Sequence, residues 1–333
     1  MINAFVLKPK EDEGLKALEA VPAEVPAGCV LWVDAQAPTG DEMEALRARF
    51  DLDHYSVEDV LHGGQRPKVE EYGTYTFSVV HLPVADGGKF KVSELFVFFS
   101  DRWFVTVHPQ RSEALDEVRK RLVARGLSPL SKVPSPDLLY YVFLDFAVDM
   151  FYPLLDVVED DLDALEKRIV GTFRARRRRV EKVTSAMAMM GGVKEKLMVL
   201  RRTLAPIRDM LGMIMRGAVP HIKDSSLRNF RDVYDHSFQL IETIDAYRDR
   251  ASDVRDLHIS LVAASTDNIV KVLTIVVTII SPLSLLAGVY GMNFTPGFYE
   301  PGSGTAYGFY AMMAGMGALA VGMAYVFRRI GWI

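Results

Sequence analysis

Polar and acidic residues recur at heptad spacing near the carboxyl end of the chain. One series falls seven residues apart: Asp267, Thr274, Ser281 and Gly288. A second series lies on nearly the same side of a helix: Val270, Val277 and Ser284. Small, hydroxylated and acidic side chains in one stripe suit a water-filled path for ions. They equally suit close packing and hydrogen bonding between helices. The spacing leaves both interpretations open.

The stretch that carries this stripe is apolar enough to cross a membrane. Residues 272–299 contain no charged side chain, which is roughly enough helix to span a bilayer core. Residues 307–327 form a second hydrophobic segment of spanning length. In this segment Ala314, Ala318 and Gly322 lie four apart, which predicts a face of small residues that packs on the first helix.

Positive charge flanks the two segments on the same side. Lys271 precedes the first segment, and Arg328 and Arg329 follow the second. By the positive-inside rule, both termini are expected in the cytoplasm. We therefore predict an integral protein of the inner or plasma membrane with two spans and an outward-facing loop.

Residues 1–135 predict a mixed α and β domain. Strands are expected at residues 29–34, 75–82, 94–100 and 103–108, and a turn at Asp86-Gly87-Gly88. Helices are expected from about Asp41, with Met43, Leu46 and Phe50 on one face, and at residues 55–61.

Long helical patterns follow this domain. Residues 138–170 read as one helix, and residues 176–215 read as a second helix that is interrupted at Gly191-Gly192 and kinked at Pro206. The run from Asp224 has no proline until Pro282, so residues 224–290 predict a helix on the order of 100 Å long. The predicted fold is an α+β cytoplasmic N-terminal domain followed by long helices and two C-terminal transmembrane helices. The predicted divisions are an α+β domain at 1–135, a cytoplasmic helical hairpin at 136–223, a stalk continuous with the first transmembrane helix at 224–290, an external loop at 291–306, a second transmembrane helix at 307–327 and a basic cytoplasmic tail at 328–333.

Composition and motifs argue against several classes of protein. The net charge of -4 gives no basic footprint for nucleic acid. A single cysteine, Cys29, allows neither an internal disulfide nor a cysteine-cluster metal site, and the amino-terminal residues predict no secretory signal. We find no phosphate-binding loop, no nucleophile elbow and no pair of histidines at metal-ligand spacing. The chain is therefore predicted not to be an enzyme or an ATP-driven pump.

The end of the first apolar segment resembles a known family. Gly291-Met292-Asn293, preceded by Lys271-Val272-Leu273-Thr274-Ile275 and Ser281-Pro282-Leu283-Ser284, is similar to the first transmembrane helix of the CorA family of divalent-cation channels. Residues 58–61, 65–70, 200–206 and 230–236 resemble the cytoplasmic part of that family in the same order.

The resemblance implies a homopentamer in which the first helix of each chain lines a pore in the lipid membrane. Its selectivity filter would be Gly291, Met292 and Asn293, with a ring of Asn293 amides holding a hydrated ion. Magnesium suits such a ring because it gives up its water shell reluctantly. Asp267 would form a carboxylate ring at the cytoplasmic mouth. The pore would be lined by Asp267, Val270, Leu273, Thr274, Val277, Ser281, Ser284 and Gly288, and Val270, Leu273 and Val277 offer apolar constrictions.

The resemblance also implies control by the transported ion. Asp232 matches a stalk acid that faces an acid of the neighbouring subunit, and Asp86 is the candidate partner. A divalent ion between the two carboxylates would hold the channel closed. Magnesium or another divalent cation is thus both substrate and regulatory ligand, and no cofactor is expected. A plain solvated role stays open for both residues.

The loop after the filter departs from the family pattern. Many members carry an acidic Met-Pro-Glu-Leu sequence there, whereas Glu300 is the only acid in residues 294–302 of this chain. The zinc-transporting ZntB branch, which shares the Gly-Met-Asn motif, is therefore the second candidate. A membrane-anchored sensor or scaffold without conductance is the third. The arginines between Arg174 and Arg179 could bind anionic lipid or be exposed.

Overall fold

The computed structural model describes residues 1–8, 16–18, 20–22, 25–109, 115–116, 118–120, 122, 134–174, 179–291 and 306–332. These residues divide into two compact units, Met1–Val254 and Arg255–Ile333. The prediction placed a boundary near residue 135, but the sheet and the helices that follow it form one unit because they share a core. The finer division of the chain into six parts stays a prediction.

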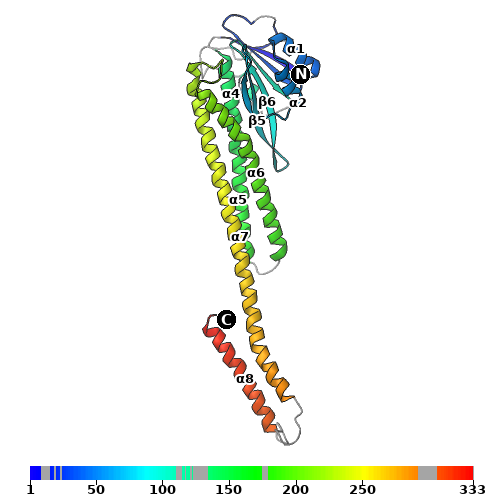
Figure 1. Ribbon diagram of the computed structural model, residues 1–333, viewed down its shortest axis with the longest axis vertical. Helices are drawn as coiled ribbons and strands as arrows, with labels where there is room; N and C mark the ends of the chain where they lie inside the picture. Colours follow the sequence, from blue (N-terminus) through cyan, green and yellow to red (C-terminus); the bar gives the residue numbers. More distant parts are fainter. Residues whose placement is uncertain are drawn as a thin grey trace. The chain divides into compact units, whose positions relative to one another are not determined.

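The first unit is built on a seven-stranded sheet in the order β2-β1-β3-β7-β6-β5-β4 (Figure 1). Neighbouring strands are antiparallel except β3 and β7, which are parallel. The strands are β1 (Ile2–Leu7), β2 (Lys16–Leu18), β3 (Val30–Gln36), β4 (Lys68–Glu71), β5 (Thr76–Asp86), β6 (Lys89–Phe99) and β7 (Trp103–His108).

The four predicted strands are confirmed: β7 has the predicted bounds, β3 is shifted by one or two residues, and β5 and β6 are longer than predicted. Asp86 pairs with Lys89, and both residues between them, Gly87 and Gly88, have positive φ. Two such residues make the tight hairpin turn whose twist matches that of β5 and β6. Three strands were not predicted: β1, β2 and β4.

One face of the sheet is covered by α1 (Gly40–Phe50) and α2 (His54–His62). Thr39 and Glu42 form a capping box that begins α1. Met43, Leu46 and Phe50 are buried, as the helical spacing predicted. Gly63 ends α2 with a positive φ of 62°, a conformation that favours glycine.

Two helices lie on the opposite face of the sheet, α4 (Pro136–Asp149) and α6 (Arg179–Met215), and α5 (Phe151–Arg174) packs along α6 (Figure 1). The prediction of one helix over residues 138–170 was wrong, because the helix is interrupted at Met150. Pro153 explains the break, since its ring lacks an N–H and clashes with the preceding turn. α6 continues through Gly191-Gly192 and Pro206 without the predicted interruption.

A short 3-10 turn (η1, Asp224–Ser226) leads into α7 (Leu227–Tyr290), a single helix of 64 residues that contains Pro282. This confirms the predicted long helix that continues into the first apolar segment. Its early turns belong to the core of the first unit, where Phe230, Val233, Leu240 and Ile244 are buried. The end of α7 belongs to the second unit.

The second unit also contains α8 (Ala306–Arg329). The residues of α8 that are partly covered share one face: Met312, Met316, Ala320, Met323, Ala324 and Phe327. Ala314, Ala318 and Gly322, predicted to pack on the first helix, are exposed. That prediction is not supported within one chain, because the larger methionine and phenylalanine side chains occupy the covered face.

Three helical stretches within the described residues are long and apolar enough to cross a membrane. Two of them, in α7 and α8, have spanning windows that are 0% buried. The third comprises α4 and α5, and 56% of its window is buried. Its apolar residues, among them Leu139, Phe143 and Phe151, pack in the core around the sheet, which accounts for its hydropathy.

Candidate functional site

The heptad stripe on α7 is exposed along its whole length. The eight predicted pore-lining residues, Asp267, Val270, Leu273, Thr274, Val277, Ser281, Ser284 and Gly288, are all exposed. The partly covered residues of this part of α7 lie on the other side of the helix: Ile275, Thr278, Ile279, Pro282 and Leu283. The stripe is therefore free to face a partner helix or water, and its assignment to a pore stays a prediction.

The predicted selectivity filter falls at the end of α7. Gly291 donates its backbone N–H to the carbonyl of Ala287 at 2.9 Å, so the helical hydrogen bonding reaches the first filter residue. Met292, Asn293 and Glu300 lie outside the described residues, as do residues 175–178 of the arginine cluster. The roles predicted for them stay predictions.

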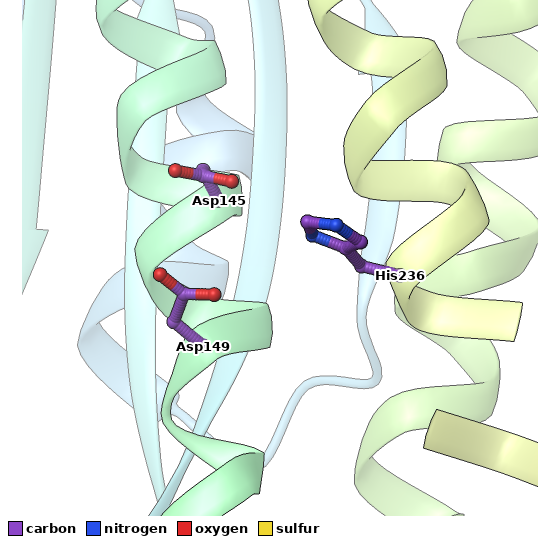
Figure 2. A group of neighbouring side chains, drawn as sticks. All are labelled: Asp145, Asp149 and His236. Carbon is purple, nitrogen blue, oxygen red and sulfur yellow. The ribbon is translucent and has the colours of Figure 1, made fainter. Parts of the chain in front are cut away.

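A second group of functional side chains lies where α4 meets the first part of α7. Asp145 and Asp149 project from neighbouring turns of α4, and His236 projects toward them from α7 (Figure 2). One ligand atom from each residue lies within 4.8 Å of the other two. Two carboxylates and an imidazole at this separation are a set that could hold a divalent cation.

Asp232 extends this group along α7. It precedes His236 by one helical turn, and its Oδ1 lies 4.0 Å from Nε2 of the histidine. Nδ1 of His236 is buried and has no hydrogen-bond partner within the described residues. We call Asp145, Asp149, Asp232 and His236 the acid–imidazole cluster.

Electrostatic repulsion and burial both act on this cluster. Burial raises the pKa of Asp145 to about 6, and the charge of Asp149 adds to the rise. Burial, with the charges of Asp145 and Asp232, raises the pKa of Tyr141 to about 12. Asp149 is the last residue of α4, where the negative end of the helix dipole disfavours a carboxylate. A bound cation would relieve all of these costs.

Asp86, the predicted partner of Asp232, lies at the end of β5 and forms an ion pair with Lys91 at 2.5 Å. Within one chain, the described neighbours of Asp232 are instead the acids of α4 and His236. A pairing with Asp86 of a neighbouring subunit stays a prediction.

Three of the four cluster residues, Asp145, Asp149 and His236, were not predicted from the sequence. No two histidines have metal-ligand spacing, whereas Asp232 and His236 form a mixed pair at i, i+4. Asp145 and Asp149 repeat the same spacing on α4. Each i, i+4 pair places two potential ligands on one helix face, and these two pairs were the only indication of the cluster that the sequence offered.

Apolar helices of spanning length, a polar stripe on α7, and a cluster between α4 and α7 that could hold a divalent cation are features of a membrane transport protein for divalent cations. The sequence model of the family described as "CorA-like Mg2+ transporter protein" matches residues 28–329. The chain therefore belongs to this family of transporter proteins.

Relatives and a solved structure agree with this assignment. YfjQ of Bacillus subtilis is 32% identical over 100% of this chain and 98% of its own length. The cobalt/magnesium transport protein CorA of Thermotoga maritima is 31% identical over 88% of this chain and 80% of that protein. The complete CorA magnesium transporter of Methanocaldococcus jannaschii matches the fold with a TM-score of 0.83, covering 100% of this chain and 99% of that one, at 23% identity. The zinc transport protein ZntB of Yersinia enterocolitica is 23% identical over 71% of this chain and 67% of that protein.

Proposed function

We propose that five copies of this chain surround a cation path lined by the stripe of α7. The path admits divalent cations into the cell, magnesium first and cobalt or nickel in addition, driven by concentration and membrane potential. The observation that carries the proposal is that α7 carries both the polar stripe and two members of the acid–imidazole cluster, Asp232 and His236. A change in cation occupancy at Asp232 and His236 thus acts on the same element that lines the path.

The proposed topology has two spans, α7 and α8, with both termini in the cytoplasm. Lys271 on α7 and the Arg328-Arg329 pair that ends α8 support it, because positive charge favours the cytoplasmic side. Apolar side chains exposed along both helices suit contact with lipid or with other copies, for example Leu285 and Val321.

The filter of this path is Gly291-Met292-Asn293. Asn293 offers a neutral amide, which can hydrogen-bond the water shell of a magnesium ion without removing it. Glu300 attracts cations to the outer mouth, and Asp267 does so at the inner mouth. Beyond the filter, Thr274, Ser281 and Ser284 offer hydroxyl groups to the hydrated ion.

Gating follows from the charges at the start of α7. When cytoplasmic magnesium is plentiful, a cation neutralises Asp232 and the acids that face it and holds α7 in the closed position. When it is scarce, the carboxylates repel one another and α7 is released. The acids that face Asp232 are Asp145 and Asp149 in its own chain and, as we further propose, Asp86 of a neighbouring subunit.

The test is magnesium flux into liposomes that contain the purified protein at low internal cation. We expect Asn293→Ala to abolish most of the flux. Asn268→Ala, a matched change on the exposed surface of α7 outside the stripe, should leave it within about twofold. Equal flux in both variants would remove Asn293 from the filter.

Zinc is the second candidate substrate, because the cluster contains an imidazole, which suits zinc better than magnesium. Repeating the flux assay with zinc, with and without a proton gradient, shows whether zinc or magnesium is the transported ion. Zinc flux with little magnesium flux would assign the chain to transport of the ZntB type. Absence of flux of either ion from a correctly assembled oligomer would favour a sensor or scaffold.

A further inference from the structure

A second polar pocket lies in the first unit, away from the acid–imidazole cluster. His81 of β5 and Glu94 of β6 are cross-strand partners, and each side chain is only 17% exposed. They line a cavity of about 380 Å³ together with Gly64, Gln65 and Pro109. This volume holds several water molecules beside the two side chains.

The double glycine after α2 assembles the pocket. Gly63 and Gly64 both have positive φ, and a Cβ on Gly63 would lie 3.0 Å from Oε2 of Glu94. The turn lets the backbone N–H of Gly64 donate to Oε2 of Glu94 at 3.0 Å. It also places the carbonyl oxygen of Gln65 2.8 Å from Nε2 of His81. The turn at the two glycines therefore brings the Glu94 carboxylate and the Gln65 carbonyl close to the imidazole of His81, and all three groups could act as metal ligands.

The two oxygen ligands, from Glu94 and Gln65, lie on the same side of the His81 imidazole, near its Nε2 atom. Oε1 of Glu94 lies 3.9 Å from Nε2 and has no hydrogen-bond partner among the residues that the structure describes. Burial lowers the pKa of His81, and the charge of Arg202 adds to this, whereas the hydrogen bond to the Gln65 carbonyl and the charge of Glu94 oppose it. A metal ion binds imidazole and carboxylate groups in their deprotonated forms.

The spacing is close to that of a coordination shell. Two ligands at about 2.0–2.2 Å from one ion lie roughly 2.8–3.1 Å apart at octahedral angles and roughly 3.3–3.6 Å apart at tetrahedral angles. The Gln65 oxygen and Nε2 of His81 are 2.8 Å apart and already have the octahedral separation, whereas Oε1 of Glu94, 3.9 Å from Nε2, would need to approach by at least about 0.3 Å. When an ion binds Nε2, the proton on that nitrogen transfers to Nδ1, so the imidazole stays neutral.

We propose that His81, Glu94 and the Gln65 carbonyl form a binding site for a first-row transition-metal ion such as Co²⁺, Ni²⁺ or Zn²⁺. Imidazole nitrogen favours these ions over magnesium, and water in the cavity completes the shell. The site does not rest on the proposed transport function, because it requires only the fold of the first unit. It gives the cytoplasmic unit a means to distinguish transition metals from magnesium.

The test is a cobalt titration of the purified full-length protein in detergent, followed by visible absorption of the bound ion. The background carries Asp149→Asn and His236→Gln, so that the acid–imidazole cluster does not contribute. We expect one Co²⁺ per chain, and at least a tenfold weaker affinity in Glu94→Gln and in His81→Gln. Glu71→Gln, an exposed change on β4, should alter the affinity less than twofold.

Two further readouts do not depend on these variants. Cobalt-edge anomalous diffraction from crystals of the unsubstituted protein should place an ion within about 2.5 Å of Nε2 of His81. A hundredfold excess of magnesium should displace less than half of the cobalt. An unchanged cobalt affinity in both variants, no anomalous peak at His81, or ready displacement by magnesium would each overturn the proposal.

Discussion

Asp232 and His236 lie one turn apart on α7, with the aspartate oxygen 4.0 Å from Nε2 of the histidine, and both face the acids of α4. A divalent ion could bridge Asp232 to these neighbouring ligands. Because Asp232 lies on α7, the ion would then be bound to the helix that carries the polar stripe.

Removal of one cluster carboxylate should weaken divalent-cation binding. Loss of even an indirect partner of a metal ligand commonly lowers metal affinity about 10- to 100-fold, so Asp149→Asn should cost at least about tenfold. The measurement is calorimetric titration of the purified protein with cobalt, in a His81→Gln background that removes the second proposed site. Asp156→Asn, which changes an exposed acid on α5, is the matched control. Equal affinities in the two variants would show that the cluster holds no ion.

The stability of the metal-free protein should fall as pH rises toward 6. Burial raises the pKa of Asp145 to about 6 from an ordinary value of 3.8, so between these values the folded chain holds a proton that the unfolded chain has lost. The folded state is therefore favoured at the acidic end of this window, and the buried charge is a cost above it.

Asp145→Asn removes this cost. The substitution should increase the free energy of unfolding by about 1–3 kcal/mol at pH 7.5, and the gain should shrink toward zero near pH 4. Denaturant unfolding in detergent with a chelator present measures both values. A gain that does not vary with pH would mean that Asp145 titrates normally.

Cation binding to the same cluster should weaken in acid. A proton on Asp145 competes with a metal ion, so the cobalt affinity should fall by up to about tenfold per pH unit below pH 6. Titrations at pH 5.0, 6.0 and 7.5 test this. In Asp145→Asn the logarithm of the cobalt affinity should change clearly less with pH. An identical dependence on pH in both proteins would contradict the prediction.

The stripe on α7 can be tested with two identical substitutions one turn apart. Thr274 lies in the stripe, where its hydroxyl donates to the carbonyl of Val270 at 2.8 Å, and Thr278 lies on the partly covered side. Thr274→Val should lower magnesium flux in liposomes by about threefold or more, because it removes a hydroxyl from the water path. Thr278→Val should change it little. The reverse order would place the path on the other side of the helix.

A buried hydrogen bond joins α4 to the sheet, in addition to the apolar packing between them. Ser78 Oγ and Tyr140 Oη lie 2.8 Å apart, and both residues are fully buried. Ser78→Ala leaves the Tyr140 hydroxyl without a partner and should lower the free energy of unfolding by about 1–3 kcal/mol. The double variant with Tyr140→Phe should recover part of this loss, because no polar group is then stranded. Thermal unfolding of the three variants measures the coupling, and additive losses would show that the two hydroxyls act independently.

Much of this protein follows from the sequence alone, because the deciding signals are local. An apolar run without charge predicts a span, Gly87-Gly88 predicts the β5–β6 turn, and the spacing of Met43, Leu46 and Phe50 predicts the buried face of α1. The long proline-free run predicts α7, and the Gly-Met-Asn motif with its flanking segments indicated the family. Each of these signals lies within a few turns of chain, where periodicity and backbone preference act.

Other features depend on residues far apart in the chain, and only the tertiary structure decided them. Asp145 and His236 are 91 positions apart and meet only because α4 and α7 pack together beside the sheet. The His81 pocket likewise requires the turn at Gly63-Gly64 to lie over the β5–β6 pair. Ala314, Ala318 and Gly322 are exposed within one chain, and their spacing does not say which neighbour the helix meets. Packing decides how deeply these side chains are buried and which charged groups lie beside them, and no single segment of the sequence encodes that packing.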